Sequence, residues 1–529
     1  MRPFVNVLFI FLLFFSGCSS NNKKETEVNQ EVFIGITDDP QALDPRLIRD
    51  TISVNVAHML FEGLMQKNRN GRIIPGLATG VDISEDKKTY TFHLRNAFWS
   101  DGSDITAEDF EYSWKSVLNP TFPAPNAYQL YVIKGAKAAK NNELPISEIG
   151  IKAIDNKTLE VTLEEPTPYF LELTTTHFFS PVNKKWAEKN SNLYSNAIIS
   201  NGPFQITNWS HNKELIFKKN PYYWDSKSVR LEKVTLVIAD ETTALHMFNR
   251  NELDWIGSPM SNIPPDAIAT LKSQRKLIFT PADGVHFLRV NTDKSPLNNK
   301  NMRKALSYAI NRKLIVDHIT QSNQKPATGI VPLSFGLQNI PYFEDNNITL
   351  AWTLFQQALI ELDLSIDEFP NISLCYTSTE RNHKIVQALQ QQWKEGLGID
   401  ITLEACEPAI FYDRLHQKNY DLTIGSWFGD IHDPINFLEV FKYKESATNN
   451  TNWENKEYIS LLEQSMHQVD SEQRKFFLSK AEHLIIDEMP VIPIYYPTFH
   501  HLQKKINGGL KDVYFSELGY IDLKNAYKG

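Results

Sequence analysis

The stretch 426–438 holds the residues best suited to chemistry, because it places two aspartates beside a tryptophan. Asp433 precedes Pro434 and an apolar run, so its carboxylate is expected to cap a helix start, where proline is tolerated. Asp430 stands three residues earlier, after the strand-like run 421–427, and has no such task. It is either a solvated loop acid or a carboxylate that faces a ligand and binds it through charge-assisted hydrogen bonds.

Motifs of common enzymes are not found in the sequence. There is no G-x-S-x-G elbow, no H-E-x-x-H zinc helix and no phosphate-binding P-loop, so any ATP chemistry is expected in a partner. His500 and His501 are adjacent and should point to opposite faces of a strand, which is a weak metal signal. We therefore expect no catalytic residues, no cofactor and no metal site, with an exported hydrolase that uses a scattered triad as the rival.

Composition indicates a large folded protein without a polyanionic partner. At about 150 residues per domain, 529 residues predict roughly three domains. The apolar content of 42% allows sizeable cores. The net charge of −9 is spread along the chain, and no basic block suggests a nucleic-acid surface.

The N-terminus is typical of an exported protein. Arg2 precedes the apolar run 4–15, which is too short to span a bilayer. Ser16-Gly17-Cys18 resembles the lipobox of bacterial lipoproteins, in which the cysteine is lipidated and becomes the new N-terminus. Residues 1–17 are thus expected to be a signal peptide and 18–30 a flexible tether. The alternative is an ordinary secretory signal with an incidental cysteine.

Two further cysteines, Cys375 and Cys406, lie in strand-like runs. A disulfide is possible in an exported protein, but one pair does not establish it. We favour two buried thiols.

Strand-like and helix-like segments alternate along the chain. A strand is expected at 32–36, helix-like segments at 60–64 and 301–319, and a capping box where Asp109 follows Thr106. The order strand 372–376, helix 381–395 and strand 399–404 predicts a parallel crossover unit. The class is therefore α/β.

The pattern Trp427-x-x-Asp430-x-x-Asp433-Pro434-x-x-Phe437-Leu438 resembles a motif of the peptide-binding proteins that serve bacterial oligopeptide ABC transporters, solute-binding family 5. The other segments that resemble this family, in the family's order, are Leu43-Asp44-Pro45, 60–64, 89–118, 201–204, 220–224, 298–312 and 490–496. They cover nearly all of the mature chain.

The resemblance implies a two-lobed, periplasmic-binding-protein-like fold of class II, a flytrap with an extra inserted α/β domain. By the order of the motifs, the expected divisions are lobe I at 31–61, 184–280 and 499–529, the inserted domain at 62–183, and lobe II at 281–498.

The same resemblance implies how a ligand is held. In the family, the aspartate at the position of Asp430 binds the ligand's α-ammonium group. The family's layout implies two strand edges that pair with an extended peptide, Arg49-Asp50-Thr51 from lobe I and Ser426-Trp427-Phe428 from lobe II. Trp427 would line a side-chain pocket, or it caps the core at the hinge.

The expected partners are an oligopeptide, the permease and ATPase subunits of an ABC transporter, and the membrane through the lipid anchor. The protein is expected to be a monomer of the bacterial cell envelope, in the periplasm or on the outer face of the cell membrane. The rival within the family is a relative that binds a nickel chelate, haem or sugar. The acid at Asp430 favours a ligand with an amine end.

The sequence departs from the family's pattern where close relatives hold the peptide carboxylate with arginines. The corresponding positions are Ile424 and Leu415, with Arg414 next to the latter. Arg381 and His383, at a helix start that favours anions, are the candidate substitutes, unless they are merely solvated. We therefore expect weak discrimination between free and amidated carboxyl ends.

Overall fold

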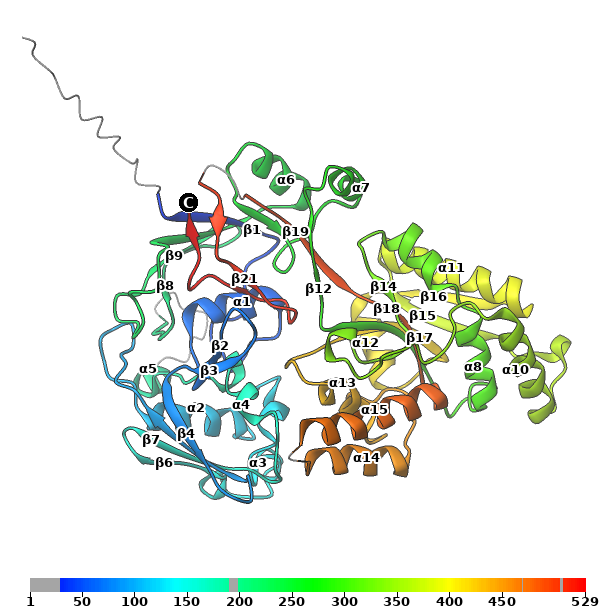
Figure 1. Cartoon of the computed structure of the whole chain (residues 1–529), viewed down its shortest axis with the longest axis horizontal. Helices are drawn as coiled ribbons and strands as arrows, with labels where there is room; N and C mark the ends of the chain where they lie inside the picture. The colour runs from blue at the N-terminus through cyan, green and yellow to red at the C-terminus, as the bar shows by residue number, and fades with distance from the viewer. Residues whose placement is uncertain (1–28, 190–197, 469, 505–507) are drawn as a thin grey trace, which may run out of the picture.

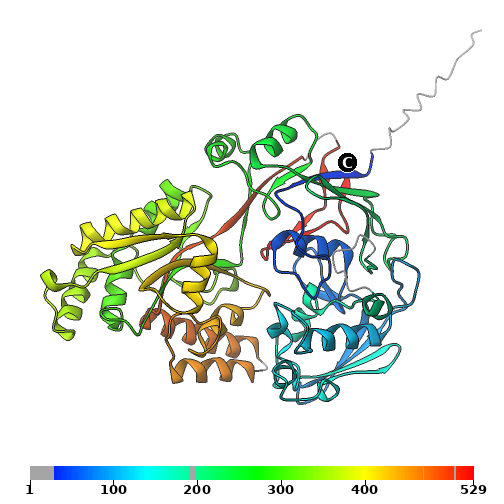
Figure 2. The same ribbon diagram turned by 180° about the vertical axis from the view of Figure 1, so that it is seen from behind.

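The computed structural model describes residues 29–189, 198–468, 470–504 and 508–529. The predicted signal peptide, Cys18 and nearly all of the tether lie outside these ranges. The described chain forms two bodies, one around a seven-stranded and a four-stranded sheet and the other around a six-stranded sheet (Figures 1 and 2). None of the described helices combines the length and the apolar character needed to cross a membrane.

The seven-stranded sheet has the order β12-β19-β11-β1-β10-β9-β8. Its central strand β1 pairs in parallel with β10 and β11, while the outer strands pair antiparallel. Val32, Ile34 and Ile36 alternate into the core, as predicted for this strand. The bounds are β1 Glu31–Ile36, β8 Phe204–Ser210, β9 Glu214–Lys219, β10 Lys233–Ile238, β11 Trp255–Gly257, β12 Ile278–Pro281 and β19 Thr498–Gln503, with helices α1 Thr51–Leu60, α5 Lys184–Lys189, α6 Glu241–Asn249 and α7 Pro265–Ser273.

The four-stranded antiparallel sheet carries helix α2 (Ala107–Leu118), which packs on β6 and β7. The predicted capping box is confirmed, because the Asp109 carboxylate accepts a hydrogen bond from the Thr106 backbone N–H at 2.9 Å. The sheet's strands are β4 Ala78–Ile83, β5 Thr89–Leu94, β7 Thr158–Thr162 and β6 Ile151–Asp155; nearby are α3 Ala136–Lys140, α4 Phe170–Leu173 and the pair β2 Met65–Lys67 and β3 Ile73–Pro75.

The six-stranded sheet has the order β14-β18-β13-β17-β15-β16. The predicted crossover is confirmed, because β15 and β16 are parallel and α11 connects them. The strands are β13 Gly284–Val290, β14 Lys325–Pro326, β15 Ile372–Thr377, β16 Ile401–Cys406, β17 Leu422–Phe428 and β18 Val491–Tyr496; the helices are α8 Lys300–Tyr308, α9 Arg312–Leu314, α10 Ile348–Glu361, α11 Glu380–Leu397, α12 Pro408–His416, α13 Ile435–Leu438, α14 Lys456–Met466 and α15 Ser471–Glu488.

The chain passes between the two bodies where a strand of one sheet continues into a strand of the other. β12 leads into β13 through Ala282 and Asp283, and β18 leads into β19 through Pro497 (Figure 1). The C-terminal segment adds the two-stranded pairs β20 Leu510–Lys511 with β23 Tyr527–Lys528, and β21 Tyr514–Phe515 with β22 Ile521–Asp522.

Two predicted helical segments differ in the structure. The helix expected at 60–64 ends at Leu60, and the next residue, Phe61, is extended with φ −130° and ψ 149°. The chain then passes so close to Thr174 that a Cβ on Gly63 would lie 2.4 Å from the Thr174 carbonyl oxygen. The helix expected at 301–319 is broken into α8, α9 and a π-helical turn, Ile315–Thr320. The Asn311 side chain caps the second segment by accepting from the Leu314 N–H, so a new helix begins there.

Cys375 on β15 and Cys406 on β16 are buried free thiols, as the sequence favours, with 3.3 Å between their sulfur atoms. They form a small apolar cluster with Phe411, Leu415 and Tyr420.

Candidate functional site

Asp430 lies just beyond the end of β17 and bridges the two bodies. Its Oδ2 accepts hydrogen bonds from the Tyr128 hydroxyl at 3.1 Å and the Gln129 amide at 2.7 Å. Its backbone N–H donates to the Asn436 side chain at 2.9 Å, which fixes the loop. Burial raises the pKa of the Asp430 carboxyl, although the two side-chain hydrogen bonds oppose the rise. The acid is therefore a partly buried acceptor rather than a solvated loop residue.

Tyr128 and Gln129 belong to the 3₁₀ helix Ala127–Leu130. This helix packs against α2 and α3, in the body that contains the four-stranded sheet. Gln129 is buried, and both side chains reach an acid about 300 residues away in the sequence. Sequence reasoning missed both, because neither a motif nor a periodicity marks them. Through these two hydrogen bonds, the body that contains the four-stranded sheet contacts the loop of Asp430 in the other body.

Strand β17 has an open edge next to Asp430. It pairs antiparallel with β13 along its whole length, from Leu422 to Phe428. On its other side, the parallel pairing with β15 involves only Leu422 and Thr423 in the part of the chain that the structure describes. Residues 424–428 therefore present backbone N–H and C=O groups on that side without a strand partner, a template for pairing with another chain.

The predicted side chains on this strand lie close to the hinge. The Ser426 hydroxyl is 2.7 Å from Nδ1 of His286 on β13. Trp427 is half-buried, and its indole N–H has no hydrogen-bond partner among the described residues. Phe428 is 47% exposed, and its ring is stacked on that of Phe499 with 6.2 Å between centroids. The Phe428 contact joins the two bodies, because Phe499 is on β19.

The prediction of a strand edge at Arg49-Asp50-Thr51 is wrong, because these residues are not part of a strand. Asp50 caps helix α1, its carboxylate accepting from the Ser53 N–H at 2.9 Å, and Thr51 is the first helical residue. Asp50 keeps the extended backbone that an N-cap residue usually has, with φ −114° and ψ 156°, but it belongs to no strand. Arg49 is exposed and lies before this cap. Asp50 and Thr51 also line a surface hollow of about 260 Å³ beside Met260.

Arg381 and His383 lie in the first turn of α11, as predicted, and both are exposed. His383 Nδ1 is 2.7 Å from the Tyr376 hydroxyl at the end of β15. Burial, followed by the positive charges of Arg381 and Arg289, lowers the pKa of His286 to about 3. Arg414 is engaged elsewhere, its guanidinium 2.6 Å from the Glu404 carboxylate.

Asp433 has a larger structural task than the predicted helix cap. Its carboxylate accepts from the Ile435 N–H at 2.9 Å, but α13 has only four residues. The same carboxylate forms a bidentate pair with Arg474 of α15, with both distances 2.8 Å. The pair is largely buried, so Asp433 anchors the loop that follows β17 to helix α15.

His432 makes a second contact between the bodies. Its backbone N–H donates to the Glu172 carboxylate at 2.6 Å, and Glu172 also pairs with Lys67 at 2.5 Å. The imidazole Nδ1 lies 2.5 Å from the buried Asp283 carboxylate. Burial lowers the pKa of His432, but the Asp283 hydrogen bond and the nearby carboxylates outweigh it, and the pKa is raised.

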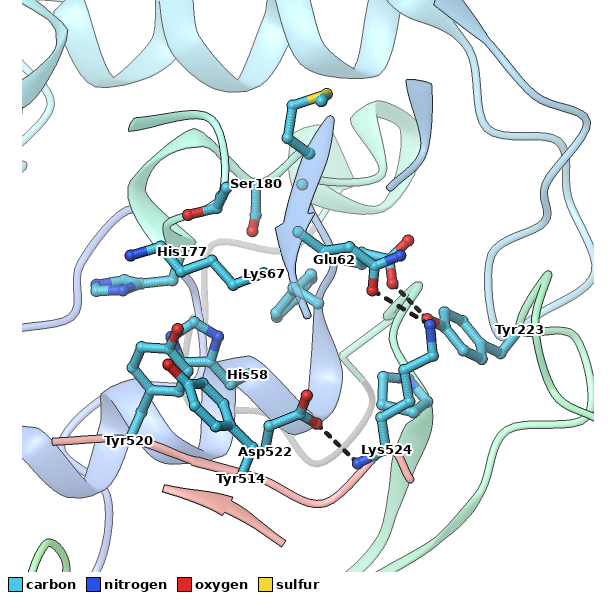
Figure 3. Close-up of a pocket in the computed structure, with 16 residues that line it drawn as sticks. His58, Glu62, Lys67, His177, Ser180, Tyr223, Tyr514, Tyr520, Asp522 and Lys524 are labelled. Atoms are coloured by element: carbon cyan, nitrogen blue, oxygen red, sulfur yellow. Dashed lines mark hydrogen bonds between the residues drawn. The ribbon is translucent and has the colours of Figure 1, made fainter. Parts of the chain in front are cut away.

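A separate cavity of about 60 Å³ lies within one body, between α1, β2 and the C-terminal segment. Figure 3 shows His58, His177 and Tyr520 on one side of it, with Glu62 and Tyr223 on the other. Burial raises the pKa of Glu62, whose carboxylate accepts from the Tyr223 hydroxyl and the Trp224 indole. The cavity has room for only a few water molecules.

Among the described residues, no group of three or more His, Cys, Asp or Glu side chains is arranged to hold a metal ion. The arrangement can instead pair with an extended backbone along β17 and accept a cationic group at Asp430.

The chain matches the family model of bacterial extracellular solute-binding proteins, family 5 Middle, over residues 72–449. It is 40% identical to the oligopeptide-binding protein OppA of Bacillus subtilis, over 99% of this chain and 98% of that protein.

Two solved structures are similar over 94% of this chain. An oligopeptide-binding protein from Borrelia burgdorferi has 29% identity and a TM-score of 0.79, with all of that chain covered. Haemophilus influenzae OppA, in complex with the peptide RPPGFSPFR, has 27% identity and a TM-score of 0.78, with 99% covered. These similarities confirm the predicted two-lobed flytrap fold. The chain belongs to family 5 of the bacterial extracellular solute-binding proteins.

Proposed function

We propose that this protein captures oligopeptides between two closing lobes and delivers them to the permease of an ABC importer. The observation that carries the proposal is the unpaired edge of residues 424–428, which leads directly to the Asp430 carboxylate. The names of similar proteins agree with it, since they are oligopeptide-binding proteins.

An open strand edge suits a receptor for many peptides. An added strand is held through its own backbone N–H and C=O groups, which are the same in every peptide. Ser426, Trp427 and Phe428 would supply these backbone contacts, and the half-buried Trp427 ring would border a side-chain pocket. Affinity then depends little on side-chain identity.

Asp430 is proposed to fix the register of the peptide by binding its α-ammonium group. No Lys or Arg side chain pairs with Asp430 in the described part of the chain, and its only side-chain partners are the neutral Tyr128 and Gln129. A partly buried carboxylate without a cation is suited to receive one from a ligand.

Lobe I is proposed to contact the peptide through Arg49, Asp50 and Thr51 at the start of α1. Arg381 and His383 of α11 are proposed as further ligand contacts from lobe II, the lobe that also contains β17. We propose that the lobes follow the divisions given by sequence, with 31–61, 184–280 and 499–529 in lobe I, 62–183 in the inserted domain and 281–498 in lobe II. Closure would turn about the two connections at 282–283 and 497.

We further propose that the protein is a monomer attached to the membrane by lipid on Cys18, at the cell envelope. Two or three acyl chains exceed what one chain provides for stable attachment. The ATP-driven step would belong to the transporter's ATPase subunit, since the sequence contains no P-loop.

Native mass spectrometry of the purified full-length chain tests the function. The expected result is a mass excess that fragments into peptide ions, or such an excess after incubation with an alanine tri- to pentapeptide mixture. Retention of a metal chelate, haem or sugar, with no binding of the peptides, would contradict it.

A further inference from the structure

Arg289 is a buried cation without an anionic partner in the described part of the chain. It lies on β13 opposite Thr423 of β17 and is 8% exposed. Its Nε is buried and has no hydrogen-bond partner, and no described carboxylate pairs with the guanidinium. The guanidinium carbon lies 4.8 Å from the centroid of the Phe287 ring, which offers no negative charge.

The guanidinium lies against the backbone of β17 where the open edge begins. A Cβ added to Gly425 would be 2.2 Å from Nη1 of Arg289, so only glycine leaves room for the group. Gly425 is the second residue of the unpaired segment 424–428. The side chain of Arg289 therefore reaches from the neighbouring strand to the part of β17 where the sequence has Ile424 in place of an arginine.

A buried guanidinium stays charged, and leaving it unpaired is costly. Burial lowers the pKa of Arg289, with the hydroxyls of Tyr420 and Tyr412 opposing this only through their charge interaction. Such a cation is normally paired, so its partner is expected to come from outside the chain.

We propose that Arg289 receives a carboxylate of the bound peptide. The proposal rests on peptide binding along β17 and identifies the cation that holds the end opposite Asp430. Gly425 and Asp430 are five residues apart, which is about 16 Å along an extended strand and fits a peptide of roughly five residues. The carboxylate is then the C-terminal one. This replaces the expectation of weak discrimination against amidated peptides, which considered residues on β17, α12 and the start of α11 but none on β13.

The test compares the full-length wild type with Arg289→Met, a substitution of similar length that removes the charge. Calorimetry with trialanine, tetra-alanine and penta-alanine, each as free acid and amide, measures the preference for the carboxylate. An amidated peptide with a glutamate at its last position distinguishes a side-chain carboxylate from the C-terminal one. Arg250→Met, an exposed arginine beside Glu252, is the control for lost charge.

We expect the wild type and Arg250→Met to prefer at least one free acid over its amide by tenfold or more, about 1.4 kcal/mol, and Arg289→Met to lose that preference. If the amidated peptide that ends in glutamate binds as tightly as the free-acid peptides, the site accepts a side-chain carboxylate as well as the C-terminal one. A preference that survives in Arg289→Met but disappears in Arg381→Met would overturn the assignment and give the role to Arg381.

A measurement without peptide separates this proposal from peptide binding itself. Removal of an unpaired buried charge should leave the thermal midpoint of Arg289→Met equal to or above that of the wild type in chloride. Acetate in place of chloride should raise the midpoint of the wild type but not of the variant. If acetate shifts the thermal midpoints of the wild type and Arg289→Met equally, and every free-acid peptide binds the two proteins equally, Arg289 is not a carboxylate site. This conclusion holds whether or not the protein binds peptides.

Discussion

Replacement of Asp430 by asparagine separates an amine anchor from a structural acid. The Oδ2 atom of Asp430 accepts hydrogen bonds from Tyr128 at 3.1 Å and from Gln129 at 2.7 Å. The Oδ1 atom of an asparagine can accept the same bonds, so Asp430→Asn removes the charge and keeps most of the geometry. The loop should remain anchored, because the bond from the residue 430 backbone N–H to Asn436 is not touched.

The loss expected on peptide binding follows from the desolvated ion pair. A ligand ammonium enclosed beside a neutral amide is a charge buried without its counter-ion, which costs about 2–5 kcal/mol, or roughly thirty- to several-thousand-fold in affinity. An N-acetylated peptide carries no such charge and should lose about 1 kcal/mol or less, the value of one neutral hydrogen bond. The coupling energy between the carboxylate and the ammonium is the difference between the two losses.

Calorimetry on the four combinations of wild type or Asp430→Asn with free or acetylated trialanine measures this coupling. Asp240→Asn is the matched control, because it removes one acid at an exposed helix cap that asparagine also serves. Equal losses for the free and acetylated peptides would refute the reasoning and leave Asp430 with a purely structural role between the lobes.

Three further outcomes are expected. Asp433→Asn breaks the largely buried pair with Arg474 and should lower the unfolding free energy, measured by urea titration, by about 3–5 kcal/mol. If Asp433 were only a helix cap, asparagine would replace it with little loss of stability. Unchanged stability would therefore argue against a stabilising pair. Burial raises the pKa of Glu482 to about 7, so the folded state binds its proton more tightly and stability should fall by ~3 kcal/mol as pH rises from about 4.5 to 7. Glu482→Gln should flatten that slope in denaturation curves, and an unaltered slope would assign it to other groups. Cys18→Ser should abolish incorporation of radiolabelled palmitate and release the protein from membranes, whereas an unlabelled wild type would exclude the lipid anchor.

Local sequence signals predicted the framework of the site well. The strand-like run 421–427 that indicates β17 and the hydroxyl-acid spacing at Thr106 both depend on neighbouring residues, and the structure contains both elements. The position of Asp430 after its strand was likewise visible, because a strand end and an acid lie within a few residues of each other.

The partners of these residues could not be predicted from the sequence. Gln129 and Arg289 reach the site from distant segments, and tertiary contacts across more than 130 residues leave no local pattern. Arg289 was overlooked because the positions considered lie on β17, α12 and the start of α11, although its side chain lies over Gly425 from the adjacent strand β13. The pairing of Asp433 with Arg474, 41 residues further along the chain, also leaves no local pattern, and the helix cap explained only part of the environment of Asp433.

A crystal structure of the protein with bound trialanine tests the central claim most directly. We expect the peptide to lie extended beside residues 424–428, with backbone hydrogen bonds to the edge that β15 leaves open and its amino nitrogen about 3 Å from Asp430. Displacement of the Gln129 amide from the carboxylate should accompany this contact. A peptide bound elsewhere, or one that lies between the lobes without pairing to β17, would contradict the account.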